Sequence, residues 1–476
     1  MQQPQWLHFI EIAGSAMSGV ALAARDMGHK ITGSDVLAYS SATTELLEEK
    51  EISWWREPAP ERLEGVDLII VSGVTTADFP ELVWARAHNV PVISFAEFVG
   101  QMTEGEDTIV VAGTHGKTTT ASLITWILED ARREPDFMIG IKPRNFGASV
   151  RLNHGKVAVI EGDEYTATQL EIRPKFDFYH PNRLILTSLE MDHPDVFKDL
   201  AQVTSHFQSL VCGLPDNSYL YRWVGSEALA ELTIPEQVTV VDYGVAAGYW
   251  SAEYVSYDVH GIQFDLLEQG VPQGRLRAQL YGAHNVANCV AAAALLLDYG
   301  LTIAQIQHGL DGFLGAARRF QLISDPSSAI RVFDDYAHHP TEATATIAAA
   351  KRHFGGRLIV AFRPHTFSRT ETLLDEYLVA FREADIAYIT DIESSRERGQ
   401  DYNVTAEDIV RSADGNVFYE PDRELLAQKL TSEARPGDTI LCMTVSGYEK
   451  LAQDVTMRLV TSLVSGASSF ERGSVN

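Results

Sequence analysis

Short apolar runs alternate with helical patterns along most of the chain, an order that is typical of parallel α/β sheets. In the first unit we expect a strand over Trp6–Ala13, a helix over Met17–Met27 and a second strand over His29–Gly33. Two further apolar runs, Asp67–Gly73 and Val90–Ser94, predict additional strands of the same sheet. The N-terminal part of the chain therefore predicts one α/β unit.

A second α/β unit begins after the acidic, glycine-containing segment Met102–Asp107, which we expect to be a linker. Its first strand is expected at Thr108–Ala112 and its first helix at Thr118–Asp130. The unit continues through two more predicted strands and an alanine-rich helix, at Val157–Glu161, Leu184–Ser188 and Val286–Tyr299.

A third unit shows the same alternation. Its strands are expected at Arg331–Asp334, Arg357–Phe362, Ile386–Thr390 and Asp438–Met443. We therefore predict three α/β domains in series, at residues 1–105, 106–314 and 315–476. Because ligands bind at the carboxyl ends of parallel strands, the residues that follow predicted strands are the candidates for chemistry.

Length and composition fit a globular protein of several domains. The chain has 476 residues, of which 45% are hydrophobic and 22% are charged. Its longest apolar stretches, such as Val290–Leu297, are far shorter than the roughly 18 residues that a membrane-spanning helix needs. The segment Met1–Gln5 lacks the basic and apolar regions of a signal peptide. We therefore expect a cytoplasmic protein with no membrane partner.

Charge and cysteine content exclude other classes of protein. The 38 Lys and Arg residues face 65 Asp and Glu residues, a net charge of −27 that would repel a nucleic-acid backbone. We expect no nucleic-acid partner, and an anionic small-molecule substrate would need local basic groups. Cys212, Cys289 and Cys442 have neither CxxC pairing nor metal-ligand spacing, so we expect reduced, mostly buried thiols.

A candidate phosphate-binding loop follows a predicted strand and opens a predicted helix, the context in which such a loop is credible. Its backbone N–H groups and the helix N-terminus can surround phosphates. Lys117 can reach the β- and γ-phosphates, and the Thr118 hydroxyl can bind Mg²⁺. Val111 stands where the usual pattern begins with glycine, and a helix-capping turn is the alternative. The loop residues are Gly113, Thr114, His115, Gly116, Lys117, Thr118 and Thr119.

Carboxylates follow two more strands of the second unit. The segment EGDE at residues 161–164 follows one predicted strand, and the segment EMDH at residues 190–193 follows another. Carboxylates beside a phosphate loop are suitable oxygen ligands for Mg²⁺, and His193 adds an imidazole. Either cluster alone is more often a solvated acidic loop, but three compatible strand ends in one unit favour a metal and phosphate site.

The segment DDYAHHP at residues 334–340 closes the first strand of the third unit. We interpret it as a ribose-binding acid with a substrate-positioning loop. His338 and His339 could be zinc ligands, but adjacent residues rarely point at one ion and no further ligand lies at helical spacing. Arg318 and Arg319 could contact a transferring phosphate, with a solvated linker as the alternative.

The loop after the first predicted strand is rich in small residues. The segment GSAMSG at residues 14–19 is similar to a diluted dinucleotide-binding loop, although it lacks the full GxGxxG spacing. An ordinary strand-to-helix turn of small residues is the alternative interpretation.

Together these residues resemble the Mur ligase family, the ATP-dependent, amide-forming ligases of peptidoglycan synthesis. The resemblance covers nearly the whole chain through the ordered segments AGTHGKTTT, EGDE, EMDH, GAHNVAN, ARRF and DDYAHHPTE. It implies a Rossmann-like N-terminal domain on the side of a UDP-linked substrate, a P-loop-type central ATPase domain, and a Rossmann-like C-terminal domain on the side of an amino acid or peptide. It also implies ATP and Mg²⁺ as cofactors and small molecules as partners.

In that family a carboxylate attacks the γ-phosphate of ATP, and an amine then displaces phosphate from the acyl phosphate. The resemblance implies that Lys117 and Thr118 hold the phosphates and a first Mg²⁺, and that Glu161 and His193 bind magnesium near the acyl phosphate. Such a protein mainly positions its substrates and neutralises charge, and closure of its three domains gates turnover.

Further roles follow from the same resemblance. His284, Asn285 and Asn288 match the adenine-side motif. Arg319 matches the phosphate contact, and Asp335 matches the ribose contact. His338 and His339 are expected near the reacting centre. The expected contacts of the UDP group are Gly14, Ser15, Ala16, Met17, Ser34 and Asp35.

Two branches of the family compete. The segment TGSD at residues 32–35 and the central segments resemble the branch that joins the tripeptide L-Ala-γ-D-Glu-meso-diaminopimelate to UDP-N-acetylmuramate during peptidoglycan recycling. The segments DDYAHHPTE and FRPHTFSRT are closer to the branch that adds L-alanine. We take the tripeptide reaction as the main hypothesis and the L-alanine reaction as its alternative.

One departure from the family keeps a further alternative open. Glu11 stands where both branches typically have glycine, in the loop that faces the UDP group. A carboxylate beside a diphosphate weakens binding unless it points away, so a Mur-type ligase for another carboxylate is an alternative. A nucleotide-binding regulator is the non-enzymatic alternative, against which Lys117, Glu161, His193 and Asp335 argue together. The sequence does not indicate an oligomeric state.

Overall fold

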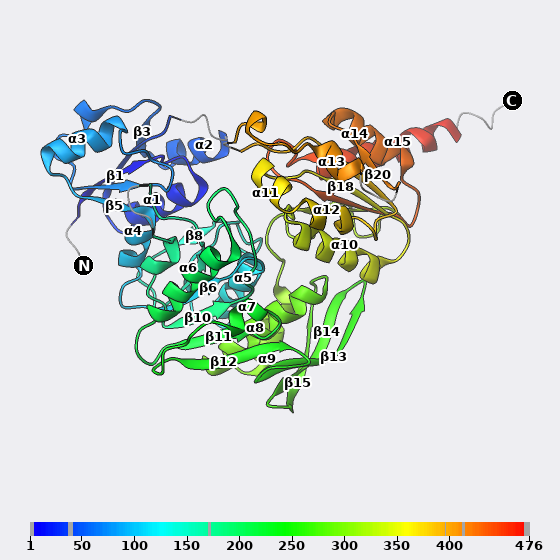
Figure 1. Cartoon of the computed structure of the whole chain (residues 1–476), viewed down its shortest axis with the longest axis horizontal. Helices are drawn as coiled ribbons and strands as arrows, with labels where there is room; N and C mark the ends of the chain where they lie inside the picture. Colours follow the sequence, from blue (N-terminus) through cyan, green and yellow to red (C-terminus); the bar gives the residue numbers. More distant parts are fainter. Residues whose placement is uncertain (1–3, 37–40, 170–172, 396, 412–414, 471–476) are drawn as a thin grey trace.

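The computed structural model describes residues 4–36, 41–169, 173–395, 397–411 and 415–470. Within these ranges the chain builds three sheets one after another. In Figure 1 the first unit, in blue, lies at the upper left and the third, in yellow to red, at the upper right, with the central unit below them. The predicted α/β class with three successive units is confirmed.

The first unit is a parallel sheet in the order β3-β2-β1-β4-β5, with helices on its faces. β1 ends earlier than the predicted end at Ala13, because Glu11 turns the chain with a φ of 64°. The strands are β1 (Trp6–Ile10), β2 (Lys30–Ser34), β3 (Ser53–Trp55), β4 (Leu68–Val71) and β5 (Val92–Ser94). The helices are α1 (Ser15–Asp26), α2 (Ser41–Glu49), η1 (Pro60–Arg62), α3 (Pro80–His88) and α4 (Phe95–Met102).

The central sheet has the order β15-β14-β13-β12-β11-β10-β6-β9-β7-β8. Its middle strands β6, β9 and β10 are parallel and almost wholly buried, because helices cover both faces of such a sheet. These strands are β6 (Asp107–Ala112), β7 (Asp136–Met138), β8 (Val150–Arg151), β9 (Val157–Gly162), β10 (Arg183–Leu186), β11 (Tyr219–Trp223) and β12 (Thr239–Val245). The helices are α5 (Lys117–Asp130), η2 (Lys175–Phe178), α6 (Leu200–Cys212), α7 (Glu227–Ala230), α8 (Ala283–Asp298) and α9 (Ile303–Gly312).

An antiparallel extension of the central sheet was absent from the sequence prediction. Three strands pair in succession beyond β12, namely β13 (Trp250–Asp258), β14 (Gly261–Glu268) and β15 (Val271–Ala278). The second half of β13 alternates between half-buried and exposed positions, and the end of β15 alternates between exposed and buried positions. Such a strand lacks the continuous apolar run of a buried parallel strand, which is why the apolar pattern did not reveal it.

The third sheet has the order β16-β17-β21-β18-β19-β20 and is parallel except for its first strand. Its strands are β16 (Gln321–Leu322), β17 (Arg331–Asp335), β18 (Leu358–Phe362), β19 (Ile386–Ile389), β20 (Val417–Tyr419) and β21 (Thr439–Met443). The helices are α10 (Pro340–Phe354), α11 (Phe367–Thr372), α12 (Leu374–Ala380), η3 (Gly399–Asp401), α13 (Ala406–Arg411), α14 (Arg423–Glu433) and α15 (Leu451–Phe470). The exact domain limits at residues 105 and 314 stay predictions.

The connection from the central to the third unit is held by a loop of the central unit. Arg144 Nη1 donates to the carbonyl oxygen of Leu314 at 2.7 Å. Asn145 donates to the carbonyl of Gly312 at 2.8 Å and accepts from the Leu314 N–H at 2.9 Å. These contacts fix the backbone of the linker where the chain leaves α9.

The expectation of mostly buried thiols holds for two of the three cysteines. Cys289 and Cys442 are buried free thiols, whereas Cys212 is exposed at the end of α6. Within the part of the chain that the structure describes, no helix combines the length and the apolarity needed to span a bilayer.

Candidate active site

The predicted phosphate loop connects the end of β6 to the start of α5. Gly113 and Gly116 have φ values of 136° and 84°, which favour glycine. A Cβ at Gly116 would lie 2.7 Å from Asn288 Oδ1, so the space is also reserved for glycine. The His115 N–H donates to Ser188 Oγ at 2.8 Å, and this bond ties the loop to the end of β10. The loop is therefore a fixed turn with its backbone close to neighbouring strands.

Lys117 begins α5, and its ammonium folds back over the loop. Lys117 Nζ donates to Glu164 Oε2 at 3.0 Å and to the Thr114 carbonyl at 3.1 Å. Burial acts to lower the pKa of Lys117, but the charges of Glu164, Asp163 and Glu161 raise it above its usual value. The side chain is therefore a fixed positive charge beside the loop.

Thr118 and Glu161, two of the three predicted magnesium ligands, are in direct contact. The Thr118 hydroxyl donates to Glu161 Oε1 at 2.5 Å, and the Gly140 N–H donates to Oε2 at 2.7 Å. Burial and the charge of Asp163 raise the pKa of Glu161. A hydroxyl and a buried carboxylate whose charge is disfavoured form a suitable pair of oxygen donors for a divalent cation.

His193, the third predicted magnesium ligand, is linked to Lys117 through Glu164, which contacts both side chains. Its Nε2 lies 3.2 Å from Glu164 Oε1 and 3.4 Å from Asp192 Oδ2. The Tyr165 hydroxyl lies 2.8 Å from its Nδ1. Although burial disfavours the charged form, Lys117 and His193 lower the pKa of Glu164 to about 2. Glu164 therefore joins the phosphate loop to the histidine.

Arg369 brings the third unit onto this cluster. It lies on α11, has a side chain only 2% exposed, and donates through Nε to Asp192 Oδ1 at 2.8 Å. Burial acts to raise the pKa of Asp192, but the Arg369 charge holds it far below its usual range. Because both groups are buried, neither can lose its partner without leaving an unpaired charge in the interior.

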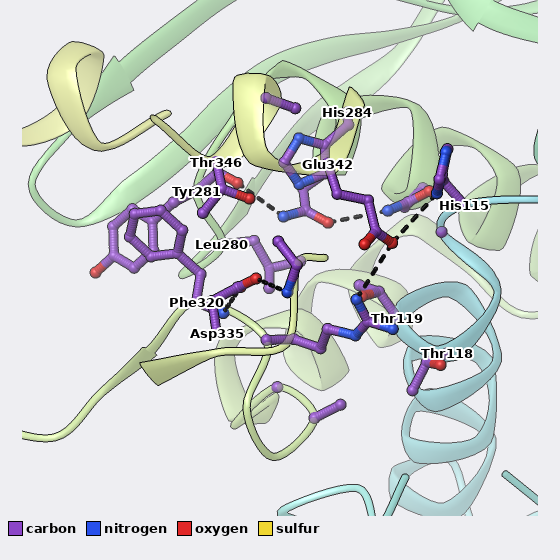
Figure 2. A pocket seen from close by; sticks show the side chains of 18 of the residues that line it. His115, Thr118, Thr119, Leu280, Tyr281, His284, Phe320, Asp335, Glu342 and Thr346 are labelled. Carbon is purple, nitrogen blue, oxygen red and sulfur yellow. Dashed lines mark hydrogen bonds and ion pairs between the residues drawn. The ribbon is translucent and has the colours of Figure 1, made fainter. Parts of the chain in front are cut away.

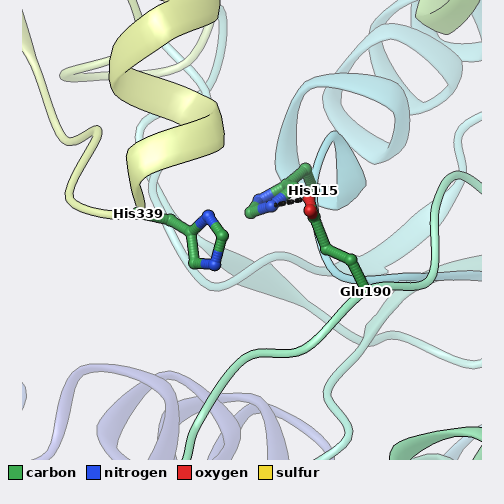
Figure 3. A group of neighbouring side chains, drawn as sticks. All are labelled: His115, Glu190 and His339. Carbon is green, nitrogen blue, oxygen red and sulfur yellow. Dashed lines mark ion pairs between the residues drawn. The ribbon is translucent and has the colours of Figure 1, made fainter. Parts of the chain in front are cut away.

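His115 forms a second ionic contact between the central and third units. Figure 3 shows its pairing with Glu190 of the central unit, through Nε2. Its Nδ1 lies 3.2 Å from Glu342 Oε1 on α10. Burial would lower its pKa, but the two carboxylates raise the pKa of His115 to about 10. The imidazole is therefore charged at neutral pH.

The same place could gather a metal ion, because ligand atoms of His115, Glu190 and His339 lie within 4.8 Å of one another. However, the carboxylates already use both nitrogens of His115. His339 Nδ1 accepts from the Thr341 N–H, which leaves its Nε2–H to donate to the Met191 carbonyl. The bonding favours an ion-paired contact between units over a metal site.

A cavity of about 450 Å³ lies between the phosphate loop, α8 and the start of the third unit (Figure 2). Its wall combines apolar side chains such as Leu280 and Phe313 with a few polar groups, the usual character of a small-molecule site. The predicted site residues that line it are His115, Gly116, Thr118, Thr119, His284, Asn285, Asn288, Arg319 and Asp335.

The polar groups of the cavity are held in place by the two units. Asp335 accepts the N–H groups of Phe320 and Ala337, each at 2.6 Å, and burial raises its pKa to about 6. Asn288 donates to Asn285 Oδ1 at 2.9 Å. Arg319 Nη1 lies 3.5 Å from Glu342 Oε1. Glu342 thus contacts both His115 and Arg319 in the wall of the cavity.

His338 lies close to the ion pair of Asp192 with Arg369. Its Nδ1 lies 2.9 Å from the Tyr336 carbonyl, and its ring is 5.4 Å from that of His365. Burial, with the charge of Arg369, lowers the pKa of His338 to about 3. The ring is therefore neutral, with Nδ1–H donating to the carbonyl and an electron pair on Nε2.

The residues predicted to contact a UDP group stay in the first unit, at the carboxyl edge of its sheet. Gly14 precedes α1, where Ser15, Ala16 and Met17 form the first turn. Asp35 accepts the Ala13 N–H at 3.0 Å. Ser34 is fully buried and its hydroxyl donates to Glu81, which gives no support to a ligand contact by this side chain.

Three residues of the site were quoted within motifs but given no role from the sequence. Glu164 ends the segment EGDE, Glu342 ends DDYAHHPTE, and Arg369 lies in FRPHTFSRT. Each contacts a residue far away along the chain, as with Arg369 and Asp192. A signal was present in the motifs, but the pairing becomes visible only in the fold.

A glycine–lysine loop between a strand and a helix, beside a cavity that the third α/β unit helps to line, is typical of an enzyme that binds a nucleotide between its units. Models of one family match three consecutive stretches: "Mur ligase family, catalytic domain" at residues 7–106, "Mur ligase middle domain" at 111–296 and "Mur ligase, glutamate ligase domain" at 318–444. The chain belongs to the Mur ligase family of ATP-dependent, amide-forming ligases.

Comparison with individual relatives shows which members of the family this chain resembles. The UDP-N-acetylmuramate–L-alanine ligase of Acetivibrio thermocellus is 31% identical over 453 residues, covering 94% of each chain. The solved UDP-N-acetylmuramate–alanine ligase of Thermotoga maritima has a TM-score of 0.75 at 24% identity, covers 97% of this chain and 100% of its own, and shows the fold.

A second branch is also represented among solved structures. The UDP-N-acetylmuramate:L-alanyl-γ-D-glutamyl-meso-diaminopimelate ligase of Neisseria meningitides is 30% identical with a TM-score of 0.60. It covers 65% of this chain and 98% of its own. The curated relatives that match along almost the whole chain are named as L-alanine ligases, so the comparisons favour the alanine branch over the tripeptide branch that we took as the main hypothesis.

Proposed function

We propose that this ligase joins L-alanine to UDP-N-acetylmuramate, with Mg²⁺ and ATP, in the cytoplasm. The observation that carries the proposal is the continuous charge network from the phosphate loop to the third unit. Lys117 binds Glu164, Glu164 binds His193, and the neighbouring Asp192 binds Arg369. The curated relatives supply the substrate class, because their names specify this donor and this amino acid.

The reaction places a carboxylate and a triphosphate against each other before an amine arrives. An oxygen of the donor carboxylate attacks the γ-phosphorus, the bond to the β,γ-bridging oxygen breaks, and ADP leaves. The amine nitrogen then attacks the acyl carbon, phosphate leaves, and one proton departs from nitrogen. Since both steps gather negative charge, the protein contributes chiefly by positioning and by fixed positive groups.

The nucleotide is assigned to the cavity. We place its phosphates on the loop from Gly113 to Thr119, with Lys117 and Arg319 as the fixed cations. Asp335 is the candidate for the ribose, since one carboxylate can accept two hydroxyl donors. His284, Asn285 and Asn288 are the candidates for the adenine side.

Thr118, Glu161 and His193 would hold magnesium, a proposal supported by the contact of Thr118 with Glu161 and by the position of His193 beside Glu164, which pairs with Lys117 of the loop. Mg²⁺ bound there neutralises charge on the phosphates. Chelation by EDTA should abolish ADP formation and excess Mg²⁺ should restore it; if these residues form the site, Glu161→Gln should also raise the Mg²⁺ concentration needed for half-maximal ADP formation at a fixed ATP concentration.

His338 is assigned to the incoming amine. Its Nε2 can accept a hydrogen bond, but a pKa near 3 makes it too weak a base to hold the proton that the amine loses. We therefore propose that His338 orients the amine. His339 caps α10 and contacts the carbonyl of Met191, so its proposed role is to hold the third unit against the central one.

The test is ADP release by the full chain with MgATP and UDP-N-acetylmuramate, adding L-alanine or the tripeptide in parallel. Release with L-alanine, and a product heavier by alanine less one water, is the expected result. Release only with the tripeptide would establish the recycling reaction instead. Silence with both amines, from protein that still binds ATP, would mean that the carboxylate donor is a different compound.

A further inference from the structure

The last turn of α10, a helix of the third unit, is attached to the central unit through one histidine. His353 is only 4% exposed. Its Nδ1 lies 2.6 Å from the Asp258 carbonyl oxygen at the end of β13, and its Nε2 lies 3.0 Å from the Gly282 nitrogen just before α8. Both partners belong to the central unit. His353 therefore joins the two units at the opposite end of α10 from Glu342 and its ion pairs.

The two partners fix the tautomer of His353. A backbone carbonyl only accepts and a backbone N–H only donates, so Nδ1 carries the proton and Nε2 accepts from Gly282. Burial lowers the pKa of His353, which favours this neutral form. Gly282 is itself buried, and a buried N–H that loses its acceptor is costly. The imidazole is therefore a specific acceptor for the backbone at the start of α8.

Tyr281, the neighbour of Gly282, belongs to the central unit but packs in the core of the third unit. Its ring lies 5.2 Å from that of Phe320 (Figure 2) and 5.0 Å from that of His353. The backbone beside it is also close to α10, because an added Cβ at Gly282 would lie 3.0 Å from the Cβ of Ala349. Side chains of the third unit thus hold this short segment of the central unit.

The same segment continues directly into residues assigned to the nucleotide. The Tyr281 carbonyl accepts from Asn285 Nδ2 at 2.7 Å, and Asn285 Oδ1 accepts from Asn288 Nδ2 at 2.9 Å. Both asparagines line the cavity, whereas His353 lies about two helical turns beyond Thr346, the last residue of α10 that lines it. A displacement of the segment would therefore move the two asparagines, although His353 itself lies outside the cavity.

We propose that His353 is a positioning residue for the nucleotide: by accepting the Gly282 N–H, it holds the start of α8 in the conformation in which Asn285 and Asn288 line the cavity. The third unit thereby contributes to nucleotide affinity from outside the cavity as well as from its wall. This inference rests on the proposed function for the assignment of the nucleotide to the cavity. Nucleotide affinity then depends on the acceptor at Nε2 and much less on the donor at Nδ1.

Two amide variants separate the two hydrogen bonds of His353. The amide of glutamine ends where Nε2 lies, so His353→Gln keeps an acceptor for Gly282. The amide of asparagine ends where Nδ1 lies, so His353→Asn keeps a donor for Asp258 but leaves Gly282 without its acceptor. Calorimetry of the full chain with MgATP should give a Kd about tenfold higher for His353→Asn, and within about twofold of the unmodified chain for His353→Gln.

Kinetics and a matched pair of controls complete the experiment. Because the contact acts on nucleotide binding, the KM for MgATP should follow the Kd, while kcat of His353→Asn falls by no more than about twofold. His260→Asn and His260→Gln are the controls, since His260 is exposed in the turn between β13 and β14. Both control variants should keep the Kd of the unmodified chain.

A Kd for His353→Asn equal to that of the unmodified chain would overturn the proposal. Equal losses in His353→Asn and His353→Gln would overturn it too, because they would indicate a general loss of packing. If His353→Asn does not fold, hydrogen exchange of the unmodified chain decides. MgATP should then slow amide exchange in residues 279–288 and also in residues 349–355, and protection confined to the first segment would contradict the proposal.

A failure of the proposed function gives a different result. The unmodified chain would then not bind MgATP, which would remove the nucleotide assignment and this inference with it. The inference alone fails when the unmodified chain binds MgATP and the His353 variants bind it equally well.

Discussion

Two strand–loop–helix turns of this chain share a topology but differ in the charge they offer. One runs from β1 into α1, and the other runs from β6 into α5. The second places glycine at its left-handed positions and adds Lys117. The first places Glu11 in a left-handed position. Topology provides a helix N-terminus that suits an anion, and the side chains at the turn then decide how much negative charge is accepted.

The two turns also differ in what supports them. Another unit covers the phosphate loop, because His115 pairs with Glu342 and the next strand end binds Arg369. Near the first turn, the Ser34 hydroxyl donates to Glu81 within the same unit. The phosphate loop is therefore a turn whose environment would change if the third unit moved.

Removal of Lys117 should give the largest effect, because its charge distinguishes the phosphate loop from the first turn. Lys117→Ala removes the fixed cation that distinguishes the phosphate loop, and we expect ADP formation to fall by about 1,000-fold. Lys156→Ala is the control, because Lys156 is exposed before β9. Circular dichroism should show that both variants are folded. Turnover that survives in Lys117→Ala would remove the phosphate-loop assignment.

The glycines of the phosphate loop give the next largest effect. Gly116→Ala forces a Cβ into the left-handed region and against Asn288, so we expect ATP affinity to fall by roughly 10- to 100-fold, about 1.4–2.7 kcal/mol. Gly147→Ala is the control, because its added Cβ meets no atom within 4 Å. Equal ATP affinities in the two variants, measured by calorimetry, would contradict the fit of the loop.

The ion pairs of His115 with Glu190 and Glu342, which support the phosphate loop, should weaken at alkaline pH. The pKa of His115 is raised to about 10 from 6.5, so its stabilising contribution is complete below pH 6.5 and is lost as the pH rises through 10. We expect a several-fold loss of ADP formation towards pH 10. Because His115 joins the central and third units, the radius of gyration from small-angle X-ray scattering should also increase.

His115→Asn removes the titrating group and serves as the test of that assignment. It should lower activity at neutral pH and flatten the alkaline loss. An alkaline loss that keeps its shape in this variant would show that another group is responsible.

The smallest expected effect concerns the stability of the first turn. Glu11→Gly relieves left-handed strain of about 1 kcal/mol but loses a hydrogen bond of about 1 kcal/mol to Ser72. The melting temperature should therefore change by less than about 3 °C. A large decrease in the melting temperature, measured by calorimetry, would mean that the contacts of Glu11 stabilise the fold by much more than its backbone strain costs.

Local patterns predicted a large part of this architecture. The buried runs that became β6, β9 and β10, and the glycine–lysine loop between β6 and α5, carry their information within a few residues. Sequence patterns did not predict the pairing of Arg369 with Asp192 or of His115 with Glu342, because each pair joins two units that are distant along the chain. The end of β1 was also missed, since the left-handed turn there falls on a glutamate.

The short tethered linker has a consequence for closure. Arg144 and Asn145 hold the backbone at Gly312 and Leu314, so the third unit starts from a fixed point close to the phosphate loop. When the contacts of Glu342 and Arg369 open, these side chains stay at a high effective concentration near their partners, in the millimolar range for a short tether. The tether therefore favours re-formation of these contacts within one molecule over their formation with groups of another molecule.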